Sequence, residues 1–171
     1  MTNVAENRFR AAVIGLLGLG FSIAPAGSAE FSPETDFVTR AATANMAATE
    51  ESRLALNRSA DPKVKAFARR LLGEHQTAEA ALQAAAQKSG ATIPAALDPE
   101  QQQRLAALRG ASRAGFDKLY LADQVAVHSN VLTLYADYML LGDNQKLKAL
   151  SIKMIPIVQA ELKDAVTLSG D

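Results

Sequence analysis

The chain has 171 residues, equal numbers of acidic and basic side chains, and no cysteine. This length favours one domain, and a formal net charge of zero without a basic patch argues against a nucleic-acid partner. The lack of cysteine excludes disulfides, a Cys-ligated zinc or iron–sulfur site, a thiol nucleophile and a lipid-modified N-terminal cysteine.

Residues 1–29 have the layout of a secretory signal peptide. Arg8 and Arg10 form a basic start, the apolar run "AAVIGLLGLGFSIAPA" follows, and small residues lead to a cleavage point after Ala29. The run is short for a membrane span, which needs about 20 residues, so an uncleaved anchor is the weaker alternative. We therefore expect export to the periplasm, no transmembrane segment after cleavage, and a mature domain of residues 30–171.

Strong helix formers dominate the mature chain, and runs typical of strands are absent. The first helix is predicted from about Ser32 to Arg58, with Pro33 in its first turn, and the second from Pro62 to about Ser89. A linker and a short helix over residues 99–110 follow. The third helix is predicted over residues 112–141 and the fourth over 145–168, where Pro156 should bend it.

The lengths of the connections predict the topology. Short turns after the first and third helices make each of them antiparallel to the helix that follows, whereas the long connection between the second and third helices allows a crossover. The sequence thus predicts an all-α, ferritin-like four-helix bundle with a long crossover that carries a short extra helix.

Each long helix has apolar positions at spacings of three and four residues, and a polar residue interrupts each series near its middle. His75 interrupts the second helix, His128 the third and Glu161 the fourth. The first helix offers two faces, one with Glu50 and one with Glu51. Buried ionisable groups need partners, so we expect these side chains to meet. The predicted metal ligands are Glu50, His75, His128 and Glu161, with Glu51, Glu74, Glu79 and Asp164 as a second tier.

Imidazole and carboxylate groups could pair by hydrogen bonds or bind a transition metal ion such as Fe, Zn, Mn or Cu. The di-iron pattern of ferritin-like proteins places Glu-x-x-His on two helices. Here Leu72 stands three residues before His75, and Val125 three residues before His128. A two-metal oxidase site is therefore incomplete.

Four segments carry a family resemblance. "DFVTRAATANMAATEESRLA", "VKAFARRLLGEHQTAEAAL", "FDKLYLADQVAVH" and "LKALSIKMIPIVQAELKDA" resemble the bacterial envelope family catalogued as domain of unknown function 4142, whose members are often labelled outer-membrane proteins. The resemblance spans about residues 31–168. It implies a ferritin-like fold and brings no established activity.

The resemblance also implies site positions. The family carries a Glu in its first helix, here Glu50, and an acid–His pair in its second, here Glu74 and His75. The family's third helix usually has Asp-His, where this chain has Val127 before His128. Glu161 occupies the family's histidine position in the fourth helix.

Three functions remain open at this point. The first is a periplasmic metal-binding module, the second an envelope structural or interaction protein without metal, and the third a carboxylate-bridged metal oxidoreductase. The incomplete di-iron pattern favours a binding protein over an enzyme. A homo-oligomer and another envelope protein are the partners we consider, and the sequence does not choose between them.

Overall fold

The computed structural model of the chain describes residues 32–89 and 91–170, and the predicted signal peptide lies outside them. The described part contains helices and no strands, as predicted. None of its helices is long and apolar enough to cross a membrane. The helices are α1 (Pro33–Arg58), α2 (Pro62–Ser89), α3 (Pro99–Gly110), α4 (Arg113–Leu141) and α5 (Gln145–Gly170).

Side-chain caps explain where the helices begin. The Ser32 and Ser112 hydroxyls accept hydrogen bonds from backbone N–H groups in the first turns of α1 and α4. Asp98 and Gln101 form a reciprocal capping box at the start of α3. Asn144 caps the start of α5, because its side-chain oxygen accepts hydrogen bonds from two backbone N–H groups. The helix continues through Pro156.

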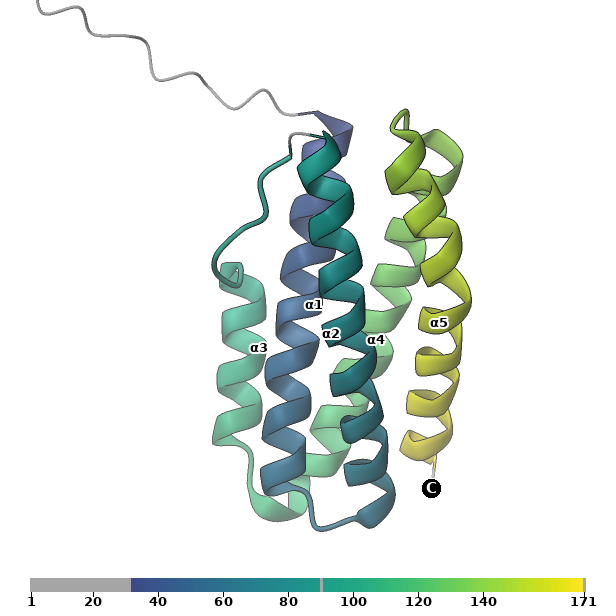
Figure 1. Cartoon of the computed structure of the whole chain (residues 1–171). Helices are drawn as coiled ribbons and strands as arrows, with labels where there is room; N and C mark the ends of the chain where they lie inside the picture. Colours follow the sequence, from purple (N-terminus) through teal and green to yellow (C-terminus); the bar gives the residue numbers. More distant parts are fainter. Residues whose placement is uncertain (1–31, 90, 171) are drawn as a thin grey trace, which may run out of the picture. The chain divides into compact units, whose positions relative to one another are not determined.

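The helices form a bundle in which α1 is antiparallel to α2, and α4 is antiparallel to α5 (Figure 1). The connection after α2 returns along the bundle through α3, so that α4 starts at the same end as α2. Contacts are densest within the α1–α2 and α4–α5 pairs and sparser between α2 and α5 and between α1 and α4. The predicted crossover is therefore present. The narrower assignment to the ferritin-like group stays a prediction.

Two arginines fasten the crossover helix to the bundle. Arg58, at the end of α1, donates to the backbone carbonyls of Leu108 and Ala111 at the end of α3, which are 2.8 Å and 2.5 Å away. Arg104 of α3 reaches Asp123 of α4, with Nε 3.2 Å from Oδ1. Arg58 thus supplies donors for the last carbonyls of α3, which have no partner within the helix.

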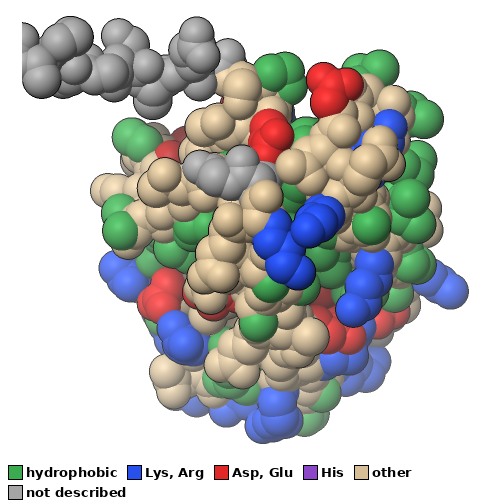
Figure 2. Space-filling model, turned by 45° about the horizontal axis from the view of Figure 1, so that its top comes forward, with side chains coloured by type: hydrophobic (Ala, Val, Ile, Leu, Met, Phe, Trp, Pro, Cys, Tyr) green, Lys and Arg blue, Asp and Glu red, His purple; other side chains and the backbone are tan. Residues whose placement is uncertain are grey.

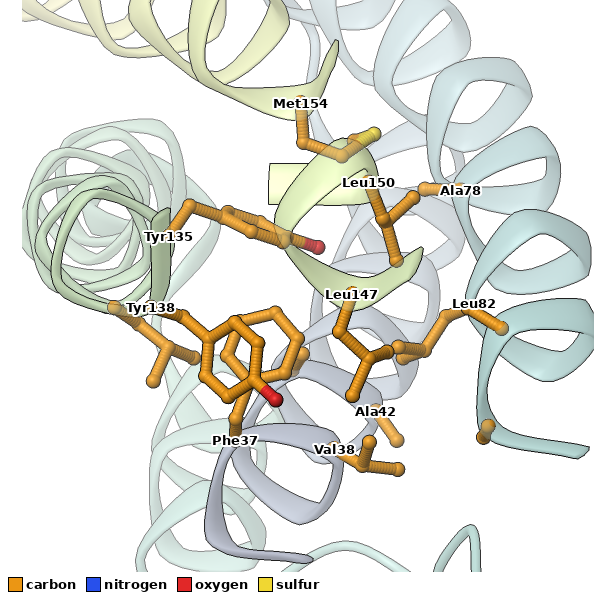
Figure 3. Close-up of a cluster of buried hydrophobic side chains, with 14 of the residues drawn as sticks. Phe37, Val38, Ala42, Ala78, Leu82, Tyr135, Tyr138, Leu147, Leu150 and Met154 are labelled. Carbon is orange, nitrogen blue, oxygen red and sulfur yellow. The ribbon is translucent and has the colours of Figure 1, made fainter. Parts of the chain in front are cut away.

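The apolar core consists of two clusters that lie towards opposite ends of the bundle. In one, Phe37 stacks on Tyr138 with ring centroids 4.0 Å apart and meets Tyr135 edge-on (Figure 3). The other gathers around Phe116 and Leu71. The segments between the two clusters contribute a buried polar layer, made of Asn45, Thr49, Glu51, Ser52, His75, Gln124, His128 and Glu161.

Candidate metal centre

Three side chains from three helices meet in the polar layer. His75 of α2, His128 of α4 and Glu161 of α5 each offer a ligand atom, and these atoms all lie within 4.8 Å of one another. The Nε2 atom of His75 is 3.9 Å from Oε1 of Glu161, and Nε2 of His128 is 3.5 Å from Oε2. The three residues are only 9%, 1% and 1% exposed. No histidine is visible on the molecular face in Figure 2.

Hydrogen bonds fix which nitrogen of each imidazole carries the proton. The Nδ1 atom of His75 lies 2.8 Å from Oδ1 of Asn45, and Nδ1 of His128 lies 2.8 Å from the backbone carbonyl oxygen of Gln124. Both partners are acceptors, so each Nδ1–H donates and each Nε2 keeps its lone pair. Within the described residues, neither Nε2 has a hydrogen-bond partner. Metal-binding histidines are held in this way by the groups behind them.

Burial makes both histidines poor bases. It lowers the pKa of His75 to about 3, with the nearby His128 as a second cause. Burial also lowers the pKa of His128, an effect that the hydrogen bond to Gln124 partly offsets. Both imidazoles are therefore neutral at neutral pH, which is the form that binds metal ions.

Burial has the opposite effect on the carboxyl group. Burial first, and then the charge of the neighbouring Glu74, together raise the pKa of Glu161 to about 8, although Arg70 lowers it in part. Without a metal ion, Glu161 thus holds a proton at neutral pH, and the cluster of three groups is uncharged.

A cavity of about 20 Å³ adjoins the cluster and is lined by Asn45, His75, His128, Tyr135 and Met154 among others. About 10–15 Å³ suffices for one water molecule. The cavity can therefore hold one small ligand beside the two Nε2 atoms, in a position that an ion with three protein ligands would leave open.

The expectation that Glu50 joins this cluster is wrong. Its carboxylate pairs with Arg53 at 2.5 Å, and its side chain is 41% exposed. Asn45 is the residue of α1 that reaches the cluster, and sequence reasoning missed it. A signal was present, since Asn45 lies on the stripe of small residues that α1 buries, four residues after Ala41 and three before Ala48.

The second-tier predicted ligands lie at different distances from the cluster. Glu74 lies close enough to Glu161 to raise its pKa, and it pairs with Arg70 at 3.3 Å. Asp164 faces Arg70 at 2.5 Å with a half-exposed side chain. Glu79 is exposed and accepts from Gln83. Of these three, only Glu74 is near the centre.

Glu51 belongs to a separate buried group between α1, α3 and α4. It accepts a hydrogen bond of 2.6 Å from Gln124. Burial first, and then the nearby Asp123, together raise the pKa of Glu51 to about 8, although Arg104 lowers it in part. The sequence pointed to Glu51 but not to Asp123 and Arg104, because their meeting depends on how the crossover helix packs.

Comparisons with known proteins agree with the fold. The family described as "Domain of unknown function (DUF4142)" matches residues 21–168. No curated protein matches the chain. A crystal structure of a DUF305 fragment from Deinococcus radiodurans is similar, with a TM-score of 0.71 at 14% identity, over 82% of this chain and 97% of that one. At this identity the likeness concerns the fold alone.

Proposed function

The chain belongs to the DUF4142 family, and we propose that it is an exported helical-bundle protein that binds one divalent first-row transition metal ion. The ligands are Nε2 of His75, Nε2 of His128 and the carboxylate of Glu161. A water molecule in the adjoining cavity completes the coordination.

One observation carries this proposal. Asn45 and the Gln124 carbonyl hold both imidazoles with Nδ1 protonated, so that two unpartnered Nε2 atoms face one carboxylate in a buried site. An isolated polar cluster without a ligand would leave these buried atoms unsatisfied, which is unfavourable by about 1–3 kcal/mol for each. A metal ion satisfies all of them at once.

The spacing fits one ion after a small adjustment. Ligand atoms about 2.0–2.1 Å from a tetrahedral ion lie roughly 3.3 Å apart. The distances of 3.5 Å and 3.9 Å to Glu161 are close to that value. Side-chain rotations that bring these ligand atoms closer together by a few tenths of an ångström would reach this value. The pair at the outer limit of 4.8 Å would have to approach by about 1.5 Å.

The donor set also indicates the class of ion. Two imidazoles suit Zn, Cu and Fe, whereas Mg and Ca prefer oxygen ligands alone. A pair of metal ions needs several carboxylates to bridge and balance them. Glu161 is the single carboxylate in the cluster, so one ion rather than two is the favoured occupancy.

Cobalt provides a direct test, because its visible absorption reports coordination by protein ligands. The metal-stripped protein is titrated with Co²⁺ and then with Zn²⁺, and the same titration is run on a His75→Gln/His128→Gln variant. We expect one ion for each wild-type chain, displacement of Co²⁺ by Zn²⁺, and no uptake by the variant. The surface variant Glu50→Gln is the matched control and should bind as wild type does.

Two results would reject the metal site. One is equal uptake by wild type and the histidine variant. The other is no uptake by wild type together with higher stability of a His75→Leu/His128→Leu variant, which would assign the polar cluster a purely structural role.

Export is the second part of the proposal and has its own test. The full chain is expressed in a Gram-negative host, and the protein in the periplasmic extract is weighed by mass spectrometry. The basic start, apolar run and small residues before Glu30 support a product that begins at Glu30. An intact chain retained in the membrane would instead support an anchor.

A further inference from the structure

The seam between α2 and α5 contains a groove of about 380 Å³ next to the polar layer. Its floor is apolar and includes Ala78, Ala81, Met154 and Ile157. This volume is within the range of small-molecule sites, about 300–1,000 Å³. At this seam, α2 and α5 make fewer contacts with each other than either makes with its hairpin partner.

Gly73 keeps one wall of the groove open. It lies in the middle of α2, where glycine is unfavourable relative to alanine. Its backbone does not require glycine for steric reasons, since an added Cβ would meet no atom within 4 Å. The packing of the described residues therefore does not explain this glycine, whereas the need for space in the groove does.

The rim of the groove is basic. Arg69, Arg70 and Lys153 line it, against one acidic residue, Glu74. Arg70 is occupied by Glu74 and Asp164. Arg69 and Lys153 are exposed, and neither has an ion-pair partner within residues 32–89 and 91–170. Two cations are thus available above an apolar floor.

We propose that this groove binds a small organic anion with an apolar body, such as an alkyl carboxylate. Arg69 and Lys153 bind the carboxylate, and the apolar body lies over Gly73 along Ala78 and Ile157. Charge complementarity selects an anion over a cation of the same shape, and burial of the alkyl chain supplies affinity.

The groove lies directly outside the candidate metal centre. Ala78 and Met154 line both the groove and the cavity of about 20 Å³ beside the histidines. Glu74 borders the groove, and its charge raises the pKa of Glu161. Binding of the anion in the groove does not depend on the proposed function. Only its position next to a metal ion rests on that function.

Octanoate is a suitable probe, and the metal-stripped protein is the right sample, because failure of the metal site then leaves this experiment intact. Calorimetric titration of wild type should show one saturable site. Gly73→Leu, which places a side chain in the groove, should abolish binding. Arg69→Glu/Lys153→Glu should weaken it at least tenfold. Lys163→Glu, an exposed charge reversal on α5 that does not line the groove, should leave the affinity unchanged.

Circular dichroism is used to check that each variant is folded, and the charge variant keeps the test decisive if Gly73→Leu is unstable. No octanoate binding to wild type would overturn the proposal, as would equal affinity in the Arg69→Glu/Lys153→Glu variant. Octyltrimethylammonium has the same chain with a cationic head. If octyltrimethylammonium bound as tightly as octanoate, the proposal that the groove selects an anion would be overturned.

Discussion

Replacement of Glu161 by glutamine should stabilise the metal-free protein at neutral pH and make little difference in acid. Glutamine has nearly the same shape as a protonated glutamic acid and never ionises. The folded-state pKa of Glu161 is raised from 4.5 to about 8 by burial. Wild type therefore loses stability as the pH rises between these two values, since the unfolded chain releases the proton and the folded chain keeps it.

The size of the effect follows from the shift. Each pH unit between the unfolded and folded pKa values changes the free energy of unfolding by about 1.4 kcal/mol. From about pH 5 to pH 7.5, wild type should lose roughly 3 kcal/mol that the Glu161→Gln variant keeps. The buried position of Glu161, 1% exposed, means that solvent screens little of this.

The histidines act in the opposite direction, which is why wild type alone is uninformative. The pKa of His75 is lowered from 6.5 to about 3, so its contribution to stability is complete above pH 6.5 and is lost as the pH falls towards 3. Between pH 6.5 and 5 this loss is about 2 kcal/mol. As the pH falls, this loss offsets much of the stability that wild type gains from Glu161. Only the difference in unfolding free energy between wild type and variant therefore isolates the carboxyl group.

Urea unfolding in the presence of a chelator, followed by circular dichroism, measures this difference at each pH. Glu50→Gln is the control, because it makes the same substitution at a surface carboxylate, beside Arg53 and away from the cluster. A constant difference between Glu161→Gln and wild type from about pH 5 to 7.5 would refute the reasoning, since it would mean that Glu161 titrates alike in the folded and unfolded chains.

Three further predictions concern zinc binding, Gly142 and Arg58. Binding of Zn²⁺ near pH 7 should release about one proton, that of Glu161, and calorimetry in two buffers of different ionisation enthalpy measures it; no release would contradict a protonated Glu161. Gly142→Ala places a Cβ 2.5 Å from the packed Tyr138 ring and should lower the unfolding free energy by about 1–3 kcal/mol; an unchanged melting temperature would contradict this packing. Arg58→Met removes the donor to the final carbonyls of α3 and should cost about 2 kcal/mol, with faster amide exchange in α3; slow exchange there would show that α3 is held otherwise.

The sequence by itself determined the helices and their order. Caps at Ser32, Asp98 and Ser112 mark helix starts, and the connection lengths allow a crossover. It also placed His75 and His128 on buried faces, because α2 and α4 carry large apolar residues whose three-and-four spacing defines one side of each helix.

Only the tertiary structure decided which side of α1 faces the centre. Alanine, threonine and serine lie on several sides of α1 itself. Its sequence pattern therefore allows one rotation of the helix that buries Glu50 and another that buries Glu51. Packing against α2 and α4 selects the second rotation, which brings Asn45 to His75 and sends Glu50 to the surface. Small side chains contrast weakly in hydrophobicity, and so the orientation of such a helix is fixed by its neighbours.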